Sequence, residues 1–532
     1  MAKPFYITTS IAYVNAAPHV GYAMELTEAD TIARYRKLRG DDVYLLTGTD
    51  EHGAKIARAA AAVAKSESDF VDENAAVFKK LVNSLGIAND DFIRTSDKKR
   101  HWPGARALWK KLEEAGDIYK ASYKGLYCVG HEAFVTEKDL VGGICEDHGK
   151  APEVIEEENY FFKLSTYASQ IEKAISTDDV RIYPETRKNE ILSFIRSGVE
   201  DVSFSRQSKD IPWGVPVPSD ESQTMYVWCD ALSNYISALG YGREDEALFQ
   251  KYWPAAMHII GKDIIRFHAV IWIGMLLAAN IALPKNIFVH GFILSGGKKM
   301  SKSLGNVINP FELIDTYGAQ AVRFFLLKEI PTFDDGDITP ERFAHSYNAD
   351  LANGLGNLVS RTAAMVEKFF ESHLTRPADE ALVSVPIKTT LDVFHSPETN
   401  IEIETASLSY VTDQVVAAQY ESAMEAFKLD KAIQVLWHLL GIMDKYIQDY
   451  EPFKLVKTDQ ASAQAVLWHV TYSLARVSRM LSPFMPETAS SISSIFGVTS
   501  PDGKQDAYII KKGEGLFPRI EEKKSDVEPK TD

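Results

Sequence analysis

The chain has 532 residues, of which 45% are hydrophobic and 25% charged, and its formal net charge is −16. This length predicts several domains, because single hydrophobic cores rarely grow beyond about 250–300 residues. The acidic balance argues against a protein coated in basic charge for nonspecific nucleic-acid binding, although a local basic groove is compatible with it.

The same bulk properties bear on where the protein works. The first residues carry no basic stretch followed by an apolar one, and the most apolar run, 269–283, is shorter than the ~20 residues that span a bilayer. The cysteines are Cys128, Cys145 and Cys229, too few for a disulfide framework in a chain of this length. We therefore expect no membrane anchor and a reducing, cytoplasmic location.

The predicted elements begin with a βαβ unit, which opens a parallel sheet. Residues 5–9 form an apolar run typical of a buried strand, 21–38 carry helical spacing that ends at Gly40, and 43–47 predict a second strand. Residues 119–222 differ in character, with two cysteines and a Pro/Gly-rich stretch at the end. This region is interpreted as an insertion between two halves of the sheet.

Strand–helix alternation resumes after the insertion and then gives way to helices. Residues 225–228, 258–260 and 286–290 predict strands, and 263–279 predict a helix. From about residue 345, long amphipathic segments near 350–370, 405–450 and 462–482 predict an all-α domain. The pattern gives six segments: 1–118 and 223–290 as the two halves of the α/β domain, 119–222 as the insertion, 291–345 as a connecting region, 346–520 as the helical domain and 521–532 as a disordered tail.

Two motifs suit the binding of a polyphosphate. Pro18-His19-Val20-Gly21-Tyr22 lies where the first helix begins, so that free backbone N–H groups, the close approach allowed by Gly21 and a donor on His19 meet an anion. Lys299-Met300-Ser301-Lys302-Ser303 supplies two cations and hydroxyl groups just after a glycine pair. Alone, each motif is also consistent with an ordinary surface turn. Both follow predicted strands, and the carboxyl ends of strands are where open α/β sheets bind ligands.

Together the two motifs resemble the two signature sequences of the class I aminoacyl-tRNA synthetases, the second in full. Further segments make the chain similar to the methionyl-tRNA synthetases from Tyr6 to about Pro486: 11–15, 47–53, 226–231, 260–263 and 267–268. The resemblance implies an α/β fold, with a Rossmann-like parallel-sheet catalytic domain split by a connective insertion and followed by an all-α anticodon-binding helical bundle. It also implies an enzyme that converts methionine and ATP to methionyl-adenylate and pyrophosphate, and then transfers the methionyl group to the 3′-terminal adenosine of tRNA(Met), releasing AMP.

The matching positions imply a set of substrate residues. Catalysis is expected from His19, Lys299 and Lys302. ATP contacts are expected from these three and from Gly21, Tyr22, Gly261, Lys262, Asp263, Met300, Ser301 and Ser303. Methionine contacts are expected from Ile11, Ala12, Tyr13, Asp50, Trp228, Ala231, Leu232, Tyr235, Ile264 and His268. A thioether packs well against aromatic rings, and a carboxylate such as Asp50 can hold an ammonium group. Without the resemblance, Trp228 and Tyr235 would be interpreted as core aromatics and Asp50 as a helix cap.

One position departs from the family pattern. Tyr22 stands where the first signature has its second histidine. Tyrosine can stack near adenine or donate a hydrogen bond, but it cannot become cationic. We therefore expect His19 to contact phosphate and Tyr22 to make a weaker contact on the nucleotide side.

The insertion contains two cysteine–histidine pairs, Cys128/His131 and Cys145/His148, each with two intervening residues. This spacing is typical of a structural zinc knuckle, which the family's insertion usually carries, often with more cysteines. The alternative is that both cysteines are buried apolar residues and both histidines lie on the surface. We expect a structural Zn²⁺ that holds the insertion over the active site and has no open coordination position.

The helical region contains the expected RNA-reading residues. The segment 353–361 resembles the family's anticodon-reading helix, where Asn357 and Arg361 share one face and can reach the bases of an unstacked loop. Phe453 occupies the position of a stacking tryptophan. Without the resemblance, Phe453 would be an ordinary core residue and Arg361 a solvated helix residue.

The remaining expectations concern partners and alternatives. We expect Mg²⁺ on the ATP triphosphate, both initiator and elongator tRNA(Met) as substrates, and specificity that rests on the synthetic pocket, because the insertion is too short for a separate editing domain. The chain ends soon after the helical region, which favours a monomer. Two alternatives stay open: another class I synthetase, such as the cysteine or valine enzyme, and a catalytically silent, synthetase-like RNA-binding protein, which Tyr22 keeps possible.

Overall fold

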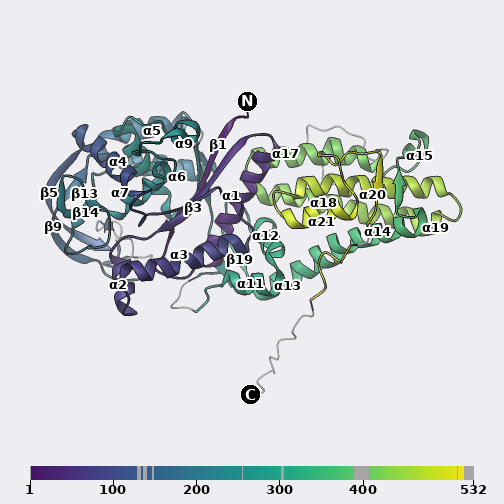
Figure 1. The fold of residues 1–532 in the computed structure, drawn as a ribbon, viewed down its shortest axis with the longest axis horizontal. Helices are drawn as coiled ribbons and strands as arrows, with labels where there is room; N and C mark the ends of the chain where they lie inside the picture. Colours follow the sequence, from purple (N-terminus) through teal and green to yellow (C-terminus); the bar gives the residue numbers. More distant parts are fainter. Residues whose placement is uncertain are drawn as a thin grey trace, which may run out of the picture. The chain divides into compact units, whose positions relative to one another are not determined.

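The computed structural model describes residues 2–128, 133–135, 140–145, 149–253, 256–300, 305–388, 406–511 and 513–520. They fall into two compact units, Met1–Phe292 and Ile293–Asp532, and each is considered by itself (Figure 1). The predicted tail at 521–532 lies outside the described residues. No helix in the described part of the chain is long and apolar enough to cross a membrane.

The first unit is built on a seven-stranded sheet in which every pair of strands is parallel. The strand order is β10-β16-β15-β1-β3-β2, and β4 also pairs with β3. The bounds are β1 (Pro4–Thr9), β2 (Ala12–Tyr13), β3 (Asp42–Asp50), β4 (Asp91–Arg94), β10 (Arg181–Tyr183), β15 (Ala256–Gly261) and β16 (Asn286–His290). The parallel sheet predicted from the opening βαβ unit is confirmed. Its central strands β1, β3, β15 and β16 all end at one edge, which we call the carboxyl edge.

Helix α1 (Val20–Leu38) connects β1 and β3, and its bounds agree with the predicted helix. His19 caps its N-terminus, and Gly40, with φ of 89°, follows its end. Most of α1 is buried, including charged residues such as Asp30, which accepts hydrogen bonds from the Arg34 side chain and the Ala88 N–H group. The other helices of this unit are α2 (Ala54–Ala62), α3 (Glu67–Ser84), α4 (Trp102–Glu114), α5 (Ala168–Ser176), α6 (Glu185–Arg196), α7 (Val227–Leu232), α8 (Asn234–Ser237), α9 (Ala247–Tyr252) and α10 (Ile273–Ala278).

Antiparallel strands interrupt the parallel sheet between α4 and α7. A long ribbon pairs β5 (Ile118–Cys128) with β9 (Glu153–Phe162), and β6 (Ala133–Val135) and β11 (Val202–Ser203) extend it. The remaining strands of this region are β7 (Leu140–Val141), β8 (Ile144–Cys145), β12 (Ser205–Gln207), β13 (Pro216–Val217) and β14 (Asp220–Met225). These strands form the expected insertion. Within the same stretch, however, β10 returns to the parallel sheet and pairs with β16.

The strand predicted at 225–228 is wrong beyond its first residue. Strand β14 ends at Met225, and helix α7 begins at Val227. Most residues of α7 are buried, so the segment is apolar on nearly every side and lacks the periodicity that separates a strand from a buried helix. The predicted helix at 263–279 is present as a 3₁₀ turn at Lys262–Ile264, a π-helical stretch at Phe267–Trp272 and α10.

The second unit begins with a small sheet and continues as a helical bundle. Strand β17 (Ile293–Ser295) pairs with β18 (Lys298–Lys299) and with β19 (Gly336–Ile338). The bundle is centred on α20 (Gln460–Leu481), which is buried along most of its length and contacts α14 (Asn357–Phe370), α18 (Leu429–Tyr450) and α21 (Pro486–Ile495).

Shorter elements complete this unit: α11 (Pro310–Tyr317), α12 (Ala319–Lys328), α13 (Pro340–Ser346), a π-helical stretch (Tyr347–Gly356), α15 (Asp379–Val383), α16 (Leu408–Tyr410), a second π-helical stretch (Val411–Val416), α17 (Ala417–Glu425), α19 (Pro452–Leu455) and the ribbon of β20 (His373–Thr375) and β21 (Ala507–Ile509). The predicted helical region is confirmed. The helix expected near 405–450 is broken at Phe427, whose φ of 56° cannot continue a helix.

Candidate active site

Three of the predicted residues of the first unit lie at the carboxyl edge. Asp50 is the last residue of β3, Gly261 is the last residue of β15, and His19 begins the helix that follows β1. Since β1 lies between β3 and β15, these three positions meet at neighbouring strand ends. This is the edge at which open α/β sheets bind ligands.

His19 uses its side chain to cap α1. The Gly21 N–H group donates to its Nδ1 at 3.1 Å, so Nδ1 is unprotonated and the single proton of the neutral ring lies on Nε2. The surrounding protein lowers the pKa of His19 by desolvation, which Asp263 and Glu25 oppose. His19 therefore presents an Nε2–H donor beside the N-terminal N–H groups of a helix, where an anion is favoured.

Gly21 is required by this arrangement. A Cβ atom at position 21 would lie 2.9 Å from both Cε1 and Nδ1 of the His19 ring, closer than a Cβ contact allows. Any larger residue would push the ring away from the helix terminus. Gly21 therefore leaves the space that the His19 ring occupies at the helix terminus.

Tyr22 points into the protein. Its hydroxyl group lies 3.0 Å from the Thr47 hydroxyl group and donates to the Gly48 carbonyl group at 3.4 Å, and its ring packs edge-on against Phe78. Burial raises the pKa of Tyr22, so the phenol stays neutral. Tyr22 thus contacts strand β3, and a direct contact with nucleotide stays a prediction.

The turn Gly261-Lys262-Asp263 lies directly after β15. A Cβ atom at Gly261 would lie 2.7 Å from Asp263 Oδ1 and 3.6 Å from His290 Cε1, so the Asp263 carboxylate folds back over the strand end. The negative charge of Asp263 partly offsets the desolvation that lowers the pKa of His19. The predicted ATP residues on α1 and after β15 therefore share one electrostatic environment.

The sequence did not single out the buried pair Glu25–His290 beneath this turn. Glu25 Oε2 lies 2.9 Å from His290 Nε2, and Oε1 accepts hydrogen bonds from the N–H and hydroxyl groups of Ser10 at 2.7 and 2.6 Å. Burial alone would lower the pKa of His290, but the hydrogen bond to Glu25 and the negative charges of Glu28 and Glu25 raise it to about 9. The pair ties α1 to the ends of β1 and β16. The sequence gives only weak indications of this pair: Glu25 follows Tyr22 by about one turn of α1, and His290 is the last residue of a predicted strand.

The predicted methionine residues all belong to the first unit and are buried or partly buried. Ala231, Leu232, Tyr235, His268 and Asp50 are buried, and Ile11, Ala12, Tyr13, Trp228 and Ile264 are partly buried. Tyr13 is in register with Asp50 across β2 and β3. Trp228 stacks on Phe267, which was not predicted, with ring centroids 3.6 Å apart.

His268 has a defined tautomer in this region. Its Nδ1 donates to the Ile264 carbonyl oxygen at 3.0 Å, and burial lowers its pKa to about 4, so the ring is neutral. Its Nε2 therefore accepts, and the Tyr235 hydroxyl group, 2.7 Å away, is the donor. A hydroxyl group and a neutral imidazole are thus held side by side in the buried interior of the first unit.

The second signature lies in the second unit. Lys299 is the last residue of β18 in the β17–β18 hairpin, and Met300 follows it directly. The turn of this hairpin is made by Gly296 and Gly297, with φ of 60° and 73°. The Gly297 N–H group donates to Asp337 Oδ1 at 2.8 Å, and the Asn306 side chain donates to the Lys299 carbonyl group at 3.3 Å. Ser301, Lys302 and Ser303 lie outside the described residues.

The predicted zinc site is described in part. Cys128 ends β5 and Cys145 ends β8, and both are buried; His131 and His148 lie outside the described residues. Two backbone hydrogen bonds join Cys145 to Gly149 and Lys150: its N–H group donates to the Lys150 carbonyl group at 2.9 Å, and its carbonyl group accepts from Gly149 N–H at 2.8 Å. No group of three metal-binding side chains occurs among the residues that the structure describes.

The predicted RNA-reading residues lie in the helical bundle. Asn357 begins α14 and is exposed, Arg361 donates from Nη2 to Asp444 Oδ1 at 2.6 Å, and Phe453 on α19 is 44% exposed. An exposed phenyl ring of this kind is available for stacking on a base.

Comparisons with known proteins agree with this architecture. A family model described as "tRNA synthetases class I (M)" matches residues 5–150 and 135–363, and one described as "Anticodon binding domain of methionyl tRNA ligase" matches 398–512. Methionine–tRNA ligases of Clostridium acetobutylicum and Brucella suis are 41% and 40% identical to the chain. The first alignment covers 98% of the chain and 78% of that relative, and the second covers 96% and 94%.

Solved structures show the same likeness. The methionyl-tRNA synthetase of Mycobacterium tuberculosis in complex with methionyl-adenylate matches with a TM-score of 0.88 at 37% identity, over 97% of this chain and 100% of that one. Its apo form matches with a TM-score of 0.82 at 34% identity, over 98% and 99%.

Proposed function

The chain belongs to the methionyl-tRNA synthetases, the class I enzymes that ligate methionine to tRNA, and we propose how its carboxyl edge carries out that reaction. The enzyme uses ATP, methionine and tRNA as substrates. The observation that carries the proposed site is the meeting of His19, Asp50 and the Gly261–Asp263 turn at adjacent strand ends.

Methionine binds with its ammonium group on the Asp50 carboxylate. Its side chain lies against Ile11, Ala12, Tyr13, Trp228, Ala231, Leu232, Tyr235, Ile264 and His268. The register of Tyr13 with Asp50 and the Tyr235–His268 hydrogen bond support this placement. The charge-assisted contact fixes the amino group, and the fixed Tyr235–His268 pair orients the thioether.

ATP binds with its phosphates at the N-terminus of α1. His19 donates from Nε2, while Gly21 keeps the ring in place. Lys262 and Asp263 contact the ribose side, and Tyr22 contributes from beneath through Thr47 and Gly48 of β3. Lys299 and Lys302, with Met300, Ser301 and Ser303, complete the contacts with the triphosphate, and Mg²⁺ accompanies it as a complex with ATP.

Two displacements follow. A methionine carboxylate oxygen attacks the α-phosphorus of ATP; a new P–O bond forms, and the bond to pyrophosphate breaks. The terminal ribose hydroxyl group of tRNA then attacks the adenylate carbonyl carbon, and AMP leaves. No side chain forms a covalent bond, so the residues act by positioning the reactants and by stabilising charge on the phosphates.

The lysine signature provides the direct test. Lys302→Ala should slow methionine-dependent ATP–pyrophosphate exchange by about 100-fold, because a charged donor to the transferring phosphate is lost. The Kd for methionine alone should stay within about twofold of the wild-type value, a difference in binding free energy of less than about half a kcal/mol. Lys298→Ala removes a neighbouring exposed lysine outside the signature and is the matched control. Undiminished exchange in Lys302→Ala would refute the assignment.

The amino-acid preference separates this function from its alternatives. Exchange measured with each of the twenty amino acids should be strong with methionine. Activity with cysteine or valine in its place would indicate another class I synthetase. The absence of exchange with every amino acid would indicate a silent RNA-binding relative.

The zinc site and the anticodon residues complete the proposal. Cys128, His131, Cys145 and His148 hold a structural Zn²⁺, supported by the burial of both cysteines and by the backbone hydrogen bonds of Cys145 with Gly149 and Lys150. Metal analysis of the purified chain should find one zinc per chain, and Cys128→Ser should lose it. Asn357, Arg361 and Phe453 read the anticodon of both initiator and elongator tRNA(Met).

The remaining parts of the proposal concern organisation. The segments are 1–118, 119–222, 223–290, 291–345, 346–520 and 521–532, and the protein acts as a monomer in the cytoplasm. Three cysteines in 532 residues are consistent with a reducing compartment. Light scattering during size-exclusion chromatography measures the oligomeric state.

A further inference from the structure

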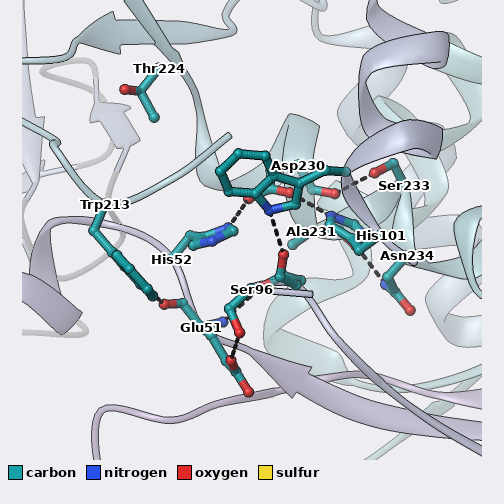
Figure 2. Close-up of polar contacts among 12 residues, drawn as sticks. Glu51, His52, Ser96, His101, Trp213, Thr224, Asp230, Ala231, Ser233 and Asn234 are labelled. Carbon is teal, nitrogen blue, oxygen red and sulfur yellow. Dashed lines mark hydrogen bonds and ion pairs between the residues drawn. The ribbon is translucent and has the colours of Figure 1, made fainter. Parts of the chain in front are cut away.

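Asp230 is the centre of a buried polar network that includes no residue assigned to either substrate. Its Oδ2 accepts from His52 Nδ1 and its Oδ1 accepts from His101 Nε2, both at 2.6 Å (Figure 2). Burial alone would raise the pKa of Asp230, but His52 and His101 hold it at about 2. An ionised carboxylate only accepts, so both ring nitrogens that face it carry protons.

His52 connects this carboxylate to the end of β3. It lies two residues beyond Asp50, and its ring packs edge-on against Trp213 with centroids 5.7 Å apart. The indole N–H group of Trp213 donates to the Glu51 carbonyl group at 2.5 Å, and the Trp213 carbonyl group accepts from Gly53 N–H at 3.3 Å. Trp213 thus holds the backbone on both sides of His52, and the orientation of the imidazole is fixed.

His101 connects the same carboxylate to α4 and α8. Its Nδ1 lies 2.9 Å from the hydroxyl group of Ser237 on α8, and His101 itself is the residue before α4. The two helices are in close contact, since a Cβ atom at Gly104 would lie 2.5 Å from the Ser237 Cβ. This ring is therefore fixed relative to α8, the helix that carries Tyr235.

Asp230 itself lies within the apolar wall of the proposed methionine site. Trp228 precedes it by two residues on α7, and Ala231 and Leu232 follow it directly. The neighbouring acid Glu51 has a different partner: both of its carboxylate oxygens accept hydrogen bonds from the Arg94 side chain of β4. Asp230 is thus a buried ionic link from the β3 end to α7.

We propose that Asp230, held by His52 and His101, is a positioning residue for methionine. It fixes the distance between Asp50, which receives the ammonium group, and the wall of Trp228, Ala231 and Leu232, which receives the side chain. The inference rests on the proposed function, because it requires the methionine site assigned above. Loss of the charge frees α7 to shift against β3, and the two ends of the substrate then no longer fit together.

The test uses Asp230→Asn, which keeps the size of the side chain and removes its charge. Methionine binding is measured without ATP by equilibrium dialysis, and KM for methionine and for ATP is measured by pyrophosphate exchange. We expect Kd and KM for methionine to rise about 10- to 100-fold, as sub-ångström to 1 Å misplacement of a substrate does. KM for ATP should change less than about twofold, because Asp230 contacts no residue of the proposed ATP site.

A matched control neutralises a hydrogen-bonded carboxylate in the other unit, which holds none of the proposed methionine residues. Asp413, in the helical unit, accepts hydrogen bonds from Tyr472 and Arg476 at 2.5 and 2.7 Å. Asp413→Asn should lower thermal stability and leave Kd for methionine at the wild-type value. A general loss of stability would therefore not reproduce the effect expected of Asp230→Asn.

Two outcomes would overturn the inference: a folded Asp230→Asn variant that binds methionine like wild type, or KM values for methionine and ATP that rise by the same factor. Should Asp230→Asn not fold, His101→Gln replaces the ring that bridges Asp230 and Ser237 and keeps the Asp230 carboxylate and its His52 contact. This variant should raise KM for methionine by a smaller factor, and an unchanged KM would count against the proposal. Failure of the proposed function is distinct, since the wild-type chain would then show no exchange with methionine.

Discussion

Two histidines at the carboxyl edge differ in charge at neutral pH. His19 accepts a backbone hydrogen bond at Nδ1 and its pKa is lowered, so it is a neutral donor at neutral pH. His290, buried beside Glu25, has a pKa of about 9 and is a cation at neutral pH. The same side chain is thus a neutral N–H donor at a helix N-terminus in one place and a buried cation in another.

The dependence of His19 on its glycine gives the first prediction. Gly21→Ala places a methyl group 2.9 Å from the His19 ring and displaces the ring from the helix cap. We expect kcat for pyrophosphate exchange to fall about tenfold, while the free energy of unfolding falls by no more than about 1 kcal/mol, the typical cost of a lost cap. Gly441→Ala on α18, where an added Cβ meets nothing within 4 Å, should leave kcat unchanged and slightly stabilise the helix. Equal loss of activity in both variants would contradict the explanation.

The Glu25–His290 pair predicts a pH-dependent stability. The pKa of His290 is raised above the 6.5 of an unperturbed histidine to about 9, so the folded state holds this proton more tightly than the unfolded state does. The stabilisation is complete below pH 6.5 and is lost as the pH rises through about 9, to a total of at most roughly 3 kcal/mol. Urea unfolding at several pH values measures it. His290→Gln should flatten the profile over this range, and equal slopes for both proteins would rule out this role.

At the scale of elements, the lysine signature begins on a short hairpin whose turn is held by the Asp337 carboxylate, which accepts from the Gly297 N–H group. Strand β19 supplies this residue while pairing in parallel with β17. Asp337 therefore joins the turn to the strand that supports it. The two glycines with positive φ let the chain reverse within two residues.

This anchor yields a prediction for the loop. Asp337→Ala frees the Gly297 N–H group, and we expect KM for ATP to rise a fewfold, by about the 1 kcal/mol of one hydrogen bond. Kd for methionine should not change, since none of the proposed methionine residues lies in this element. Asp379→Ala, which removes an exposed acid that pairs with Arg376, is the control. A change of methionine affinity in Asp337→Ala would show that the hairpin acts elsewhere.

Elements with strong local signals could be predicted from sequence, and long-range contacts could not. The opening strand, α1 and β16 follow from apolar spacing, and their predicted bounds agree with the structure to within one or two residues. The segment at 225–228 was mistaken for a strand because a buried helix and a buried strand are equally apolar. Asp230 and His52 are 178 positions apart, so no local pattern reveals that they meet. The motifs predicted the proposed substrate residues. The buried polar pairs, such as Asp230 with His52, could be identified only from the three-dimensional structure.

At the scale of the whole molecule, the chain consists of two compact units, Met1–Phe292 and Ile293–Asp532. The first contains the parallel sheet and the proposed methionine residues, and the second contains the helical bundle with Asn357, Arg361 and Phe453. Activation of methionine needs no contact with an anticodon. We expect charging of tRNA to use the proposed residues of both units.

The division predicts a clean separation of two assays. Arg361→Ala and Phe453→Ala should each lower kcat/KM for aminoacylation of tRNA(Met) by about 10- to 100-fold, the value of a stacked or hydrogen-bonded base. Pyrophosphate exchange without tRNA should be unchanged. Lys431→Ala, at an exposed position near the start of α18, should affect neither assay. Reduced exchange in the Arg361 or Phe453 variants would mean that these residues support the catalytic unit as well.

The order of strands in the sheet has a consequence for synthesis on the ribosome. Strand β1 pairs with β3 on one side, which is made soon afterwards, but its other partner, β15, follows 250 positions later, as the Thr8–His258 contact shows. At about 5–20 residues per second, one side of the first strand therefore stays unpaired for roughly 10–50 s. An open strand edge that persists this long invites pairing with other nascent chains. The protein is thus expected to rely on chaperones that shield its early strands until translation has passed the second half of the sheet.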